Sequence, residues 1–475
     1  MADTTRLGTA DEGLSPLLNA ALRVALPFLL LLLAPGLVSA QEAEISSGDT
    51  AWMLISTALV LFMTAGLAFF YGGLVPSKNV LNTMMMSFIA FGFGGILWAV
   101  VGYSLAFGGE GAFIGDTSMA LLNGVGLEAS GTIPHILFMA YQATFAIITA
   151  ALISGAVIGR MKFGAYVAFI SVWGLLVYAP VAHWVWNANG WLFGMAALDF
   201  AGGAVVHVNA GAAALAAAIV LGPRSDYGRR AMLPHNVPFV LLGAGILWFG
   251  WMGFNGGSAL GANGLAALGV VNTLVAPAAT LVVWSLLDVM FAKHITAVGA
   301  ATGIVVGLVA VTPAAGFVSP MSAIALGAIA AFPSYFVLRW RARSRLDDSL
   351  DVFAAHGVGG FTGAILTGVF ATTALNPAGQ DGLLLGNPRQ VVVQLIAVGA
   401  VFLYSAVGTV VIMKAVEMVA GLRPTSDKER RGMDVLAHGE EGYASGEGAV
   451  LILDEELNGN APQAMVAATS AMRKA

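Results

Sequence analysis

Two histidines stand in apolar, glycine-rich stretches of the sequence, each shortly after an aspartate. His207 lies in DFAGGAVVHVNAG, which begins at Asp199, and His356 lies in DVFAAHGVGGFTG, which begins at Asp351. A single histidine in such a stretch more often has only a structural role in packing. Two histidines in matching positions favour a functional role over a structural one. No carboxylate stands at ligand spacing and the chain has no cysteine, so we expect no metal site. Two hydrogen-bonded neutral imidazoles would suit a small polar solute or a proton.

The aspartates have structural explanations as well as functional ones. Asp199 precedes an apolar segment as an N-cap would, with its carboxylate accepting backbone N–H bonds. A buried capping carboxylate also projects a negative potential, so capping and attraction of a cation are compatible. Asp288 and Asp351 stand beside basic loops, and we expect them to cap helix ends or pair with arginines.

Aromatic residues gather in three further stretches. FMAYQATFA places Tyr141 and Phe145 one helical turn apart, and FGWMGFNGGS places Trp251, Phe254 and Ser258 on one helix face. HWVWNANGW adds Trp184, Trp186 and Trp191. Most such residues form interfacial belts in membrane proteins. If Trp, Phe and a Ser hydroxyl converge beside a buried carboxylate, they instead form a cation site.

The composition decides the class of protein that must position these residues. Of 475 residues, 58% are hydrophobic and only 10% are charged, and 60 are glycine. This proportion of charged residues is too low to cover the water-exposed surface of a soluble protein. The sequence therefore indicates an all-α integral membrane protein with closely packed helices. GxSxG, HExxH and paired catalytic carboxylates are absent from the sequence, which argues against an enzyme.

The first 40 residues are typical of a secretory signal peptide. A basic residue, Arg23, precedes a short leucine-rich run that contains Pro27, and Val38-Ser39-Ala40 stands before Gln41. We therefore expect cleavage after Ala40, with the mature chain beginning outside the cytoplasm. A retained first helix is the competing interpretation.

Eleven later segments are apolar and long enough to cross a hydrocarbon layer of ~30 Å. They lie near 51–73, 80–106, 134–159, 163–186, 200–222, 236–257, 264–290, 296–317, 321–339, 351–374 and 391–420. The odd-numbered connections hold most of the basic residues: Lys78, Arg160, Lys162, Arg224, Arg229, Arg230, Lys293, Arg339, Arg341, Arg343 and Arg345. By the positive-inside rule these connections and the C-terminus are cytoplasmic, and the N-terminus is outside.

Eleven segments divide into two five-helix repeats and a final helix. A repeat of five reverses its orientation in the membrane, as in many transporters. We expect repeat one at about 51–222, repeat two at about 236–374 and the last helix at about 391–420, followed by a cytoplasmic tail over 421–475. The helices that carry His207 and His356 then run in opposite directions, so the two histidines could meet inside the membrane.

Together these segments resemble the ammonium transporter family (Amt/Mep/Rh), and its Amt branch more than Rh. The resemblance runs from about residue 46 to 445. It rests on DFAGGAVVHVNAG, FGWMGFNGGS, DVFAAHGVGG, YQATFA and the tail motif GMDVLAHGEEGY. Any one of these motifs alone would be weak, but the set is specific. The ammonium transporter domain is expected over 46–420.

The resemblance implies roles for particular residues. By its motifs, an outer NH4+ site is formed by Trp186, Phe145 and Ser258, with Asp199 nearby, and Phe145 and Phe254 are the stacked rings of a pore gate. The pore is then lined by His207, His356 and Trp251, and Thr312 matches a residue of its inner half. The implied activity is recruitment of NH4+, its deprotonation and conduction of NH3 with separate proton transfer.

The resemblance also implies an assembly and partners. The family forms homotrimers in the membrane lipid, and in bacteria a PII-type regulatory protein binds its cytoplasmic face and the tail takes part in regulation. Ammonium, ammonia and the analogue methylammonium are the expected solutes, and the cell inner membrane is the expected location. No cofactor and no nucleic acid is implied. The segment after Tyr443 matches no part of this pattern.

Two other functions within the family stay open. An ammonium sensor would use the same outer site and signal through the tail, with little or no transport. A Rh-like gas channel fits less well, because a neutral gas needs no cation site of the kind that Trp186 and Ser258 predict.

Overall fold

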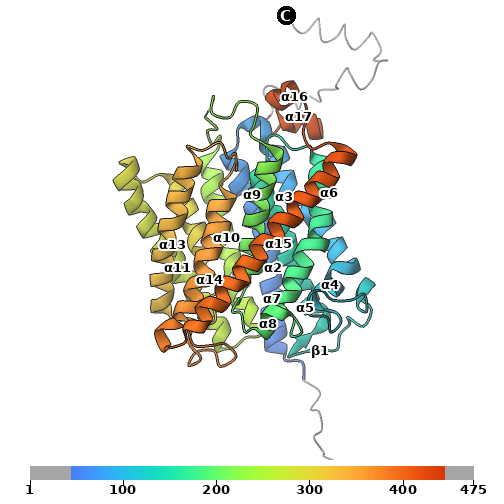
Figure 1. Cartoon of the computed structure of the whole chain (residues 1–475), viewed down its shortest axis with the longest axis vertical. Helices are drawn as coiled ribbons and strands as arrows, with labels where there is room; N and C mark the ends of the chain where they lie inside the picture. Colours follow the sequence, from blue (N-terminus) through green and yellow to red (C-terminus); the bar gives the residue numbers. More distant parts are fainter. Residues whose placement is uncertain (1–43, 230, 444–475) are drawn as a thin grey trace, which may run out of the picture. The chain divides into compact units, whose positions relative to one another are not determined.

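The computed structural model describes residues 44–229 and 231–443, and everything below concerns those residues. They lie in a unit that begins at Ile45, so the predicted signal peptide falls outside the described residues, as does the segment after Tyr443. Ten apolar helical segments there are long enough to cross a membrane. The major helices are α2 (Ser47–Leu74), α3 (Val80–Leu97), α5 (His135–Val157), α6 (Phe163–Trp173), α7 (Ala179–Trp186), α9 (Asn209–Leu221), α10 (Val237–Gly256), α11 (Gly264–Ala292), α12 (Ala297–Val311), α13 (Pro320–Arg341), α14 (Gly359–Phe370) and α15 (Pro388–Ala420) (Figure 1).

Shorter elements extend or connect these helices. They are 3-10 turns η1 (Ser77–Asn79), η3 (Ala120–Leu122), η6 (Gly257–Ala259) and η8 (Leu383–Leu385), π-helical turns η2 (Trp98–Gly102), η4 (Gly174–Tyr178), η5 (Gly203–Val208) and η7 (Phe353–Val358), short helices α4 (Tyr103–Phe107), α8 (Trp191–Gly194), α16 (Ser426–Arg431) and α17 (Met433–His438), and strands β1 (Ala129–Ser130) and β2 (Ile133–Pro134). The strands form an antiparallel hairpin in which Ala129 pairs with Pro134 and Ser130 with Ile133.

The segment predicted at 296–317 differs from the other ten. Its helix, α12, has 15 residues and ends at Val311, so it spans only about 22 Å. Pro313 follows and cannot donate a backbone hydrogen bond, and residues 312–317 form turns. The predicted count of eleven full-length spans is therefore reduced to ten long helices and one shorter apolar helix in the described part of the chain.

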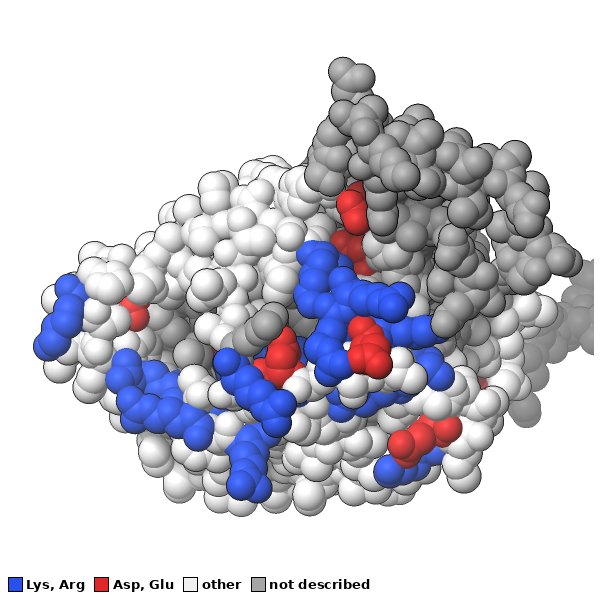
Figure 2. Space-filling model, turned by 90° about the horizontal axis from the view of Figure 1, so that it is seen from above, with Lys and Arg blue, Asp and Glu red and all other residues white. Residues whose placement is uncertain are grey.

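The helix ends define two faces of the unit. The face that we call the tail face carries α16, α17 and the connections 75–79, 158–162, 222–236, 293–296 and 342–352. The opposite face, the hairpin face, carries β1, β2 and the connections 108–134, 187–202 and 312–319 (Figure 1). Figure 2 shows the tail face, where Lys and Arg side chains are spread over the surface among fewer acidic ones.

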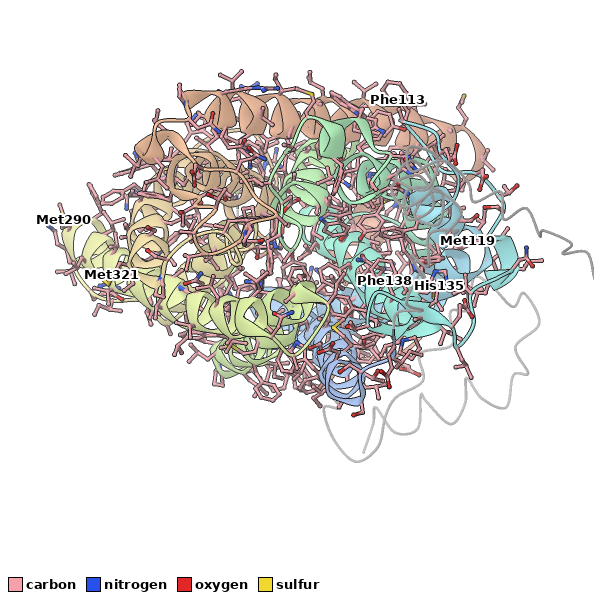
Figure 3. The ribbon with its side chains drawn as sticks, turned by 90° about the horizontal axis from the view of Figure 1, so that it is seen from below. Phe113, Met119, His135, Phe138, Met290 and Met321 are labelled. Atoms are coloured by element: carbon pink, nitrogen blue, oxygen red, sulfur yellow. The ribbon has the colours of Figure 1, made fainter. Side chains whose placement is uncertain are left out.

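The hairpin face has a different character. Figure 3 views it from below, with Met119, His135 and Phe138 near one another on one side and Phe113 apart from them at the upper edge. His135 anchors the hairpin to α4, because its Nε2 lies 2.7 Å from the Tyr103 hydroxyl and its Nδ1 lies 3.2 Å from Glu128. The labelled Met290 and Met321 project from α11 and α13, both exposed, as lipid-facing residues would.

Two of the spans are far more enclosed than the rest. In an apolar stretch of 18 residues within each span, 83% of the residues are buried in Gly203–Leu221 and 78% in α5, whereas 33% are buried in α11 and in α15. α9 packs between α5 and α15, and α15 crosses obliquely over its neighbours (Figure 1). A helix that is apolar all round and fully enclosed is the core of a membrane protein. Phe145 on α5 and His207 on η5 therefore lie at the centre of the fold.

The described tail is docked on its own unit. The Asp434 carboxylate on α17 accepts hydrogen bonds from the Leu81 and Asn82 amides at the start of α3, at 3.0 and 2.8 Å. Glu429 on α16 pairs with Arg423 at 2.6 Å and accepts the Ser225 amide. These contacts join the tail to the start of α3 and to the connection that follows α9.

Candidate functional site

Asp199 holds the start of the half-helix that carries the first histidine. Its carboxylate accepts the backbone amides of four successive residues, Gly202 to Val205, at 2.5–3.0 Å. Gly202 has a φ of +113°, which a side chain would disfavour and which lets the chain turn sharply into η5. Asp199 therefore caps the start of η5, as the sequence predicts. Its carboxylate faces the backbone rather than an open cavity.

The two histidines meet in the centre of the fold. The Nδ1 atoms of His207 and His356 lie 3.2 Å apart, with ring centroids separated by 5.3 Å. In such a contact one Nδ1 carries the proton and the other accepts it. His207 Nε2 is buried and has no partner within the described protein. A buried imidazole nitrogen without a partner is free to bind a solute in the adjoining cavity.

Trp251 stacks beside His207 and is itself held in place. The ring centroids of the two residues are 5.3 Å apart, nearly parallel. The indole Nε1 donates to the Thr312 hydroxyl at 2.9 Å, and Thr312 donates to the Leu308 carbonyl. Thr312, expected in the inner half of the pore, lies instead behind Trp251 at the end of α12 and lines neither cavity described below. Its contact shows a role in holding the tryptophan.

Aromatic rings close the route toward the hairpin face. Phe145 and Phe254 stack with centroids 4.2 Å apart, and Trp186 meets Phe145 edge to face at 5.8 Å. The Trp186 Nε1 donates to the Asp199 backbone carbonyl at 3.0 Å. The four residues come from α5, α10, α7 and the turn before η5, so only the tertiary structure brings them together.

Ser258 lies at the outer edge of these rings and is only half-buried. Its hydroxyl donates to the Phe254 carbonyl at 2.8 Å, and Tyr141 lies 3.3 Å away. Because the serine proton is used, the oxygen lone pairs are left to accept a bond from an N–H donor. Sequence reasoning noticed Tyr141 but gave its hydroxyl no role, and that hydroxyl contacts the Gly253 and Phe254 carbonyls at 2.9 Å.

Two cavities continue from the rings toward the tail face. The first, of about 10 Å³, is lined by apolar side chains together with Phe254, Trp251, His207 and His356. This volume is at the lower limit for one water molecule. The second, of about 850 Å³, opens toward the tail face and also reaches His356 and Tyr71. We call it the vestibule. Phe254, His207 and His356 all line the narrow cavity, and His356 also lines the vestibule, so the two cavities meet at His356.

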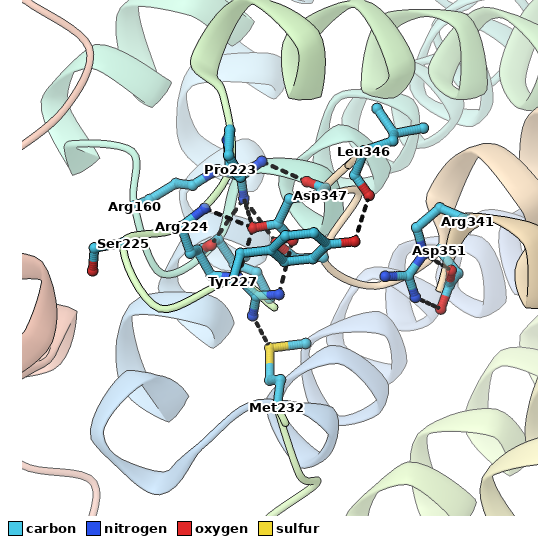
Figure 4. A network of polar contacts seen from close by, with 12 residues as sticks. Arg160, Pro223, Arg224, Ser225, Tyr227, Met232, Arg341, Leu346, Asp347 and Asp351 are labelled. Atoms are coloured by element: carbon cyan, nitrogen blue, oxygen red, sulfur yellow. Dashed lines mark hydrogen bonds and ion pairs between the residues drawn. The ribbon is translucent and has the colours of Figure 1, made fainter. Parts of the chain in front are cut away.

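A polar network stabilises the wall of that vestibule (Figure 4). Arg224 binds both oxygens of Asp347 at 2.8 Å, and the buried Arg160 donates to the Asp347 carbonyl and the Ser349 hydroxyl. Arg341 binds Asp351 through two bonds of 2.6 and 2.8 Å. These contacts tie the ends of α5, α9 and α13 to the connection that leads into η7.

The partner of Asp199 in the second half is Asp348 rather than Asp351. Asp348 precedes His356 by eight residues, as Asp199 precedes His207, and its Oδ2 accepts the Phe353 amide of η7 at 2.7 Å. Asp351, which the sequence comparison of the two halves had matched to Asp199, instead forms the expected pair with Arg341. The equal spacing was the signal that would have identified Asp348.

Glycines allow the two half-helices to cross closely. A Cβ added at Gly211 would lie 2.3 Å from the Cα atom of Gly357, and one at Gly360 would lie 3.0 Å from the His207 Cβ atom. Both glycines stand four residues after their own histidine. Small residues at a membrane helix crossing let the backbones approach, and here the approach sets the distance between the imidazoles.

Comparison with known proteins decides the family. The sequence matches the Ammonium Transporter Family over residues 51–443. An ammonium transporter of Aquifex aeolicus is 50% identical over 409 residues, 85% of this chain and 95% of the relative. One of Bacillus subtilis is 46% identical over 400 residues, 83% of this chain and 98% of the relative. The chain belongs to the ammonium transporter family.

Solved structures agree with this assignment. Saccharomyces cerevisiae Mep2 superposes with a TM-score of 0.76 at 34% identity, covering 81% of this chain and 89% of that one. A protein titled "Sensor Amt Protein" gives 0.76 at 28% identity, covering 82% and 98%. The resemblance predicted from the motifs is therefore confirmed. The chain is a multi-pass membrane protein of a transporter family, and not an enzyme.

In this family member, the predicted site residues fall into two groups. Phe145, Phe254, Trp186 and Ser258 form the ring-lined mouth near the hairpin face, and His207, His356 and Trp251 line the narrow cavity behind it. Asp199 and Thr312 support those groups from behind. Asp288, also expected to cap or pair, accepts the Thr296 amide and hydroxyl at the start of α12.

Proposed function

We propose that the protein conducts ammonium across the membrane along the route from the ring-lined mouth to the vestibule. The observation that carries the proposal is the contact between His207 and His356 at 3.2 Å, placed between a mouth closed by rings and an open vestibule. Both imidazoles lie in the same narrow cavity, so a solute that passes one must pass the other.

The mouth is suited to a cation that donates hydrogen bonds. The Trp186 and Phe145 rings offer negative π faces, and Ser258 offers hydroxyl lone pairs. Asp199 lies close behind Trp186 and adds negative potential without contacting the solute. NH4+ is stabilised by attraction to the π faces and by a directional hydrogen bond to the hydroxyl. K+ is stabilised by electrostatic attraction alone, because it has no hydrogen-bond donor.

The narrow cavity disfavours any permanent ion. At about 10 Å³ it holds at most one water molecule, so an ion would enter almost without hydration, at a cost of many kcal/mol. Ammonium can avoid that cost because it can release a proton and pass as NH3. We infer that the proton moves separately through the imidazole pair, one of which accepts while the other donates.

The tail face is the cytoplasmic side in this proposal. Its connections carry the Lys and Arg residues, and the positive-inside rule places such connections in the cytoplasm (Figure 2). The N-terminus of the mature chain is then outside, α12 together with the turns 312–317 completes an eleventh crossing, and the two inverted five-helix repeats precede α15.

Assembly and regulation are proposed from the family resemblance. We expect a homotrimer in the cell inner membrane, with one route in each subunit, and a PII-type protein at the tail face. The docked tail supports a regulatory role because it contacts the connections after α2 and α9 through Asp434 and Glu429. Cleavage of the signal peptide after Ala40 stays a prediction.

The proposal is tested with the purified protein in liposomes. Wild-type protein should give an inward current with ammonium and none with K+. His207→Ala and His356→Ala should each lower methylammonium uptake by at least about tenfold or admit K+, because removal of one imidazole breaks the relay. His294→Ala, an exposed histidine outside both cavities, is the control and should behave as wild type. Unchanged uptake and ion selectivity in both pore variants would refute the relay.

A sensor function is the second candidate, because the protein titled "Sensor Amt Protein" shares the fold over most of this chain. A sensor would bind ammonium at the mouth and pass the signal to the docked tail. Ammonium binding measured by calorimetry, together with absence of both current and methylammonium uptake, would select the sensor over the transporter.

A further inference from the structure

The two carboxylates that hold the histidine half-helices are satisfied unequally. Asp199 accepts four backbone amides, two at each oxygen. Asp348 is fully buried, yet only its Oδ2 has a partner among the described hydrogen bonds, the Phe353 amide, and its Oδ1 has none within the described protein. Four amide donors stabilise the ionised form of a carboxylate. The ionised form of Asp348 is stabilised less, because only two amides, those of Phe353 and Val352, favour it and its Oδ1 has no partner within the described protein.

The neighbouring side chains do not supply the missing hydrogen bond to Asp348. Arg224 forms an ion pair with Asp347, and Arg341 forms one with Asp351. None of the described basic side chains forms an ion pair with Asp348. The charged and titratable groups that interact with it are Asp351 on its own connection, Arg341 on α13, Arg160 after α5 and Tyr71 on α2. Asp348 reaches His356 through the Phe353 amide of η7, the turn that carries the histidine.

An orphaned buried oxygen of this kind is satisfied when the carboxyl carries a proton or meets a water molecule. Asp348 lies in the connection between α13 and η7, outside the membrane-spanning helices. Burial raises the pKa of its carboxyl to about 7, and the neighbouring Asp351 carboxylate acts in the same direction. The group is therefore neutral when the tail side is acidic and ionised when it is alkaline.

We propose that Asp348 is a positioning residue for His356 whose charge sets how readily a proton passes the inner imidazole. The inference rests on the proposed transport function. The ionised carboxylate stabilises positive charge near the inner end of the route, and the protonated carboxyl does not. Burial also raises the pKa of the Asp199 carboxyl, but only to about 6, because four backbone amides stabilise its charged form. The two halves of the fold thus share one capping device, and the inner carboxyl titrates at the higher pH and lies on the tail side.

The test separates the charge of Asp348 from its capping role. Asp348→Asn keeps an oxygen that can accept the Phe353 amide and resembles the protonated form. Wild-type and variant proteins are placed in liposomes, and ammonium current is measured while the pH on the tail side is varied from about 5.5 to 8.5, on either side of the pKa. At each pH the driving force is the same for both proteins, so the ratio of variant to wild-type current reports Asp348 alone.

We expect this ratio to be near one at the acidic end and to fall about fivefold at the alkaline end, as for one partly screened unit charge. Asp351→Asn is the matched control from the same connection. Its ratio should not fall at the alkaline end, because Asp348 is ionised there in both proteins. A change at the acidic end is expected, since loss of the Asp351 charge lowers the pKa of Asp348. Asp348→Ala should lower the current at every pH, because it also removes the cap. Size-exclusion profiles in detergent verify that each variant folds.

The outcomes are distinguishable. A ratio for Asp348→Asn that stays constant over the whole pH range would overturn the inference while the transport function stands. A wild-type protein that gives no ammonium current at any pH would overturn the proposed function itself.

Discussion

At the scale of single residues, the mouth and the narrow cavity depend on atoms whose bonding capacity is only partly used. Ser258 spends its proton on the Phe254 carbonyl and keeps its lone pairs, and His207 keeps Nε2 without a partner. Trp251, by contrast, is fully engaged through Thr312. In the proposed function, the free groups are the ones that bind a solute, and the fully bonded groups hold the walls of the cavity.

Replacement of Ser258 should affect binding more than turnover. Ser258→Ala removes the lone pairs that accept a bond from the ammonium N–H, a charge-assisted bond of about 1.5 kcal/mol or more. We expect KM for methylammonium to rise about tenfold with little change in maximal uptake. Ser258→Thr keeps the hydroxyl and serves as the control. A KM for Ser258→Ala equal to that of wild type would show that the hydroxyl does not contact the solute.

At the scale of elements, two half-helices beginning in unwound turns bring the histidines to mid-fold. Each starts beside an aspartate, carries its histidine in a π-helical turn and continues as an α-helix. A π-turn inside a helix is uncommon and often stands at a functional site. The close crossing at Gly211 and Gly357 then sets the distance between the rings.

An alanine at the crossing should therefore separate the imidazoles. Gly211→Ala places a methyl group 2.3 Å from the Gly357 Cα atom, where only a backbone shift can relieve the clash. We expect methylammonium uptake to fall by at least about tenfold and the melting temperature in detergent to drop by several degrees. Gly399→Ala on α15 is the control, since nothing lies within 4 Å of its Cβ. Equal uptake by the two variants would contradict the crossing as the element that positions the rings.

At the scale of the whole molecule, the tail and the route are connected through the tail-face loops. α17 rests on the start of α3, and α16 contacts the loop after α9 that also carries Arg224 of the vestibule wall. His438 takes part in this docking, with Nε2 3.4 Å from the Asn82 amide nitrogen and its ring 4.8 Å from that of Phe163.

Docking of the tail should weaken in acid because of His438. Burial lowers the pKa of this imidazole below its ordinary value of 6.5. The docked tail then binds a proton less well than the free tail, so docking is fully stable above about pH 6.5 and is lost progressively as the pH falls below it. A spin label at Arg431→Cys, in a chain with no native cysteine, should become more mobile between about pH 7.5 and 5.5.

The same label in a His438→Asn protein is the control for the tail. An asparagine cannot be protonated in this range, so the mobility should no longer increase on acidification. The raised pKa of Asp434, caused by its burial, acts in the opposite direction, so an increase in mobility on acidification cannot come from Asp434. If the mobility in wild type did not change with pH, His438 would be excluded as the sensitive group.

The sequence by itself determined the class of protein and its family, placed the ends of most helices to within a few residues, and predicted the site residues. Apolar segments longer than a bilayer can form only helices there, because every backbone group must be bonded internally. That argument gave ten of the predicted segments as long helices, and the family motifs named His207, His356 and the mouth residues. At 296–317 the helix is shorter than predicted, because Pro313 closely follows its last residue, Val311, and the eleventh crossing stays a proposal.

Only the tertiary structure decided which of these residues act together. It paired Asp348 rather than Asp351 with Asp199, placed Thr312 behind Trp251, and left one oxygen of Asp348 without a partner. The physical reason is that hydrophobic periodicity records which face of a helix is apolar but not which atom of a neighbouring helix it meets. Hydrogen bonds, ring contacts and the volume of the narrow cavity depend on distances between segments over 100 residues apart in the chain.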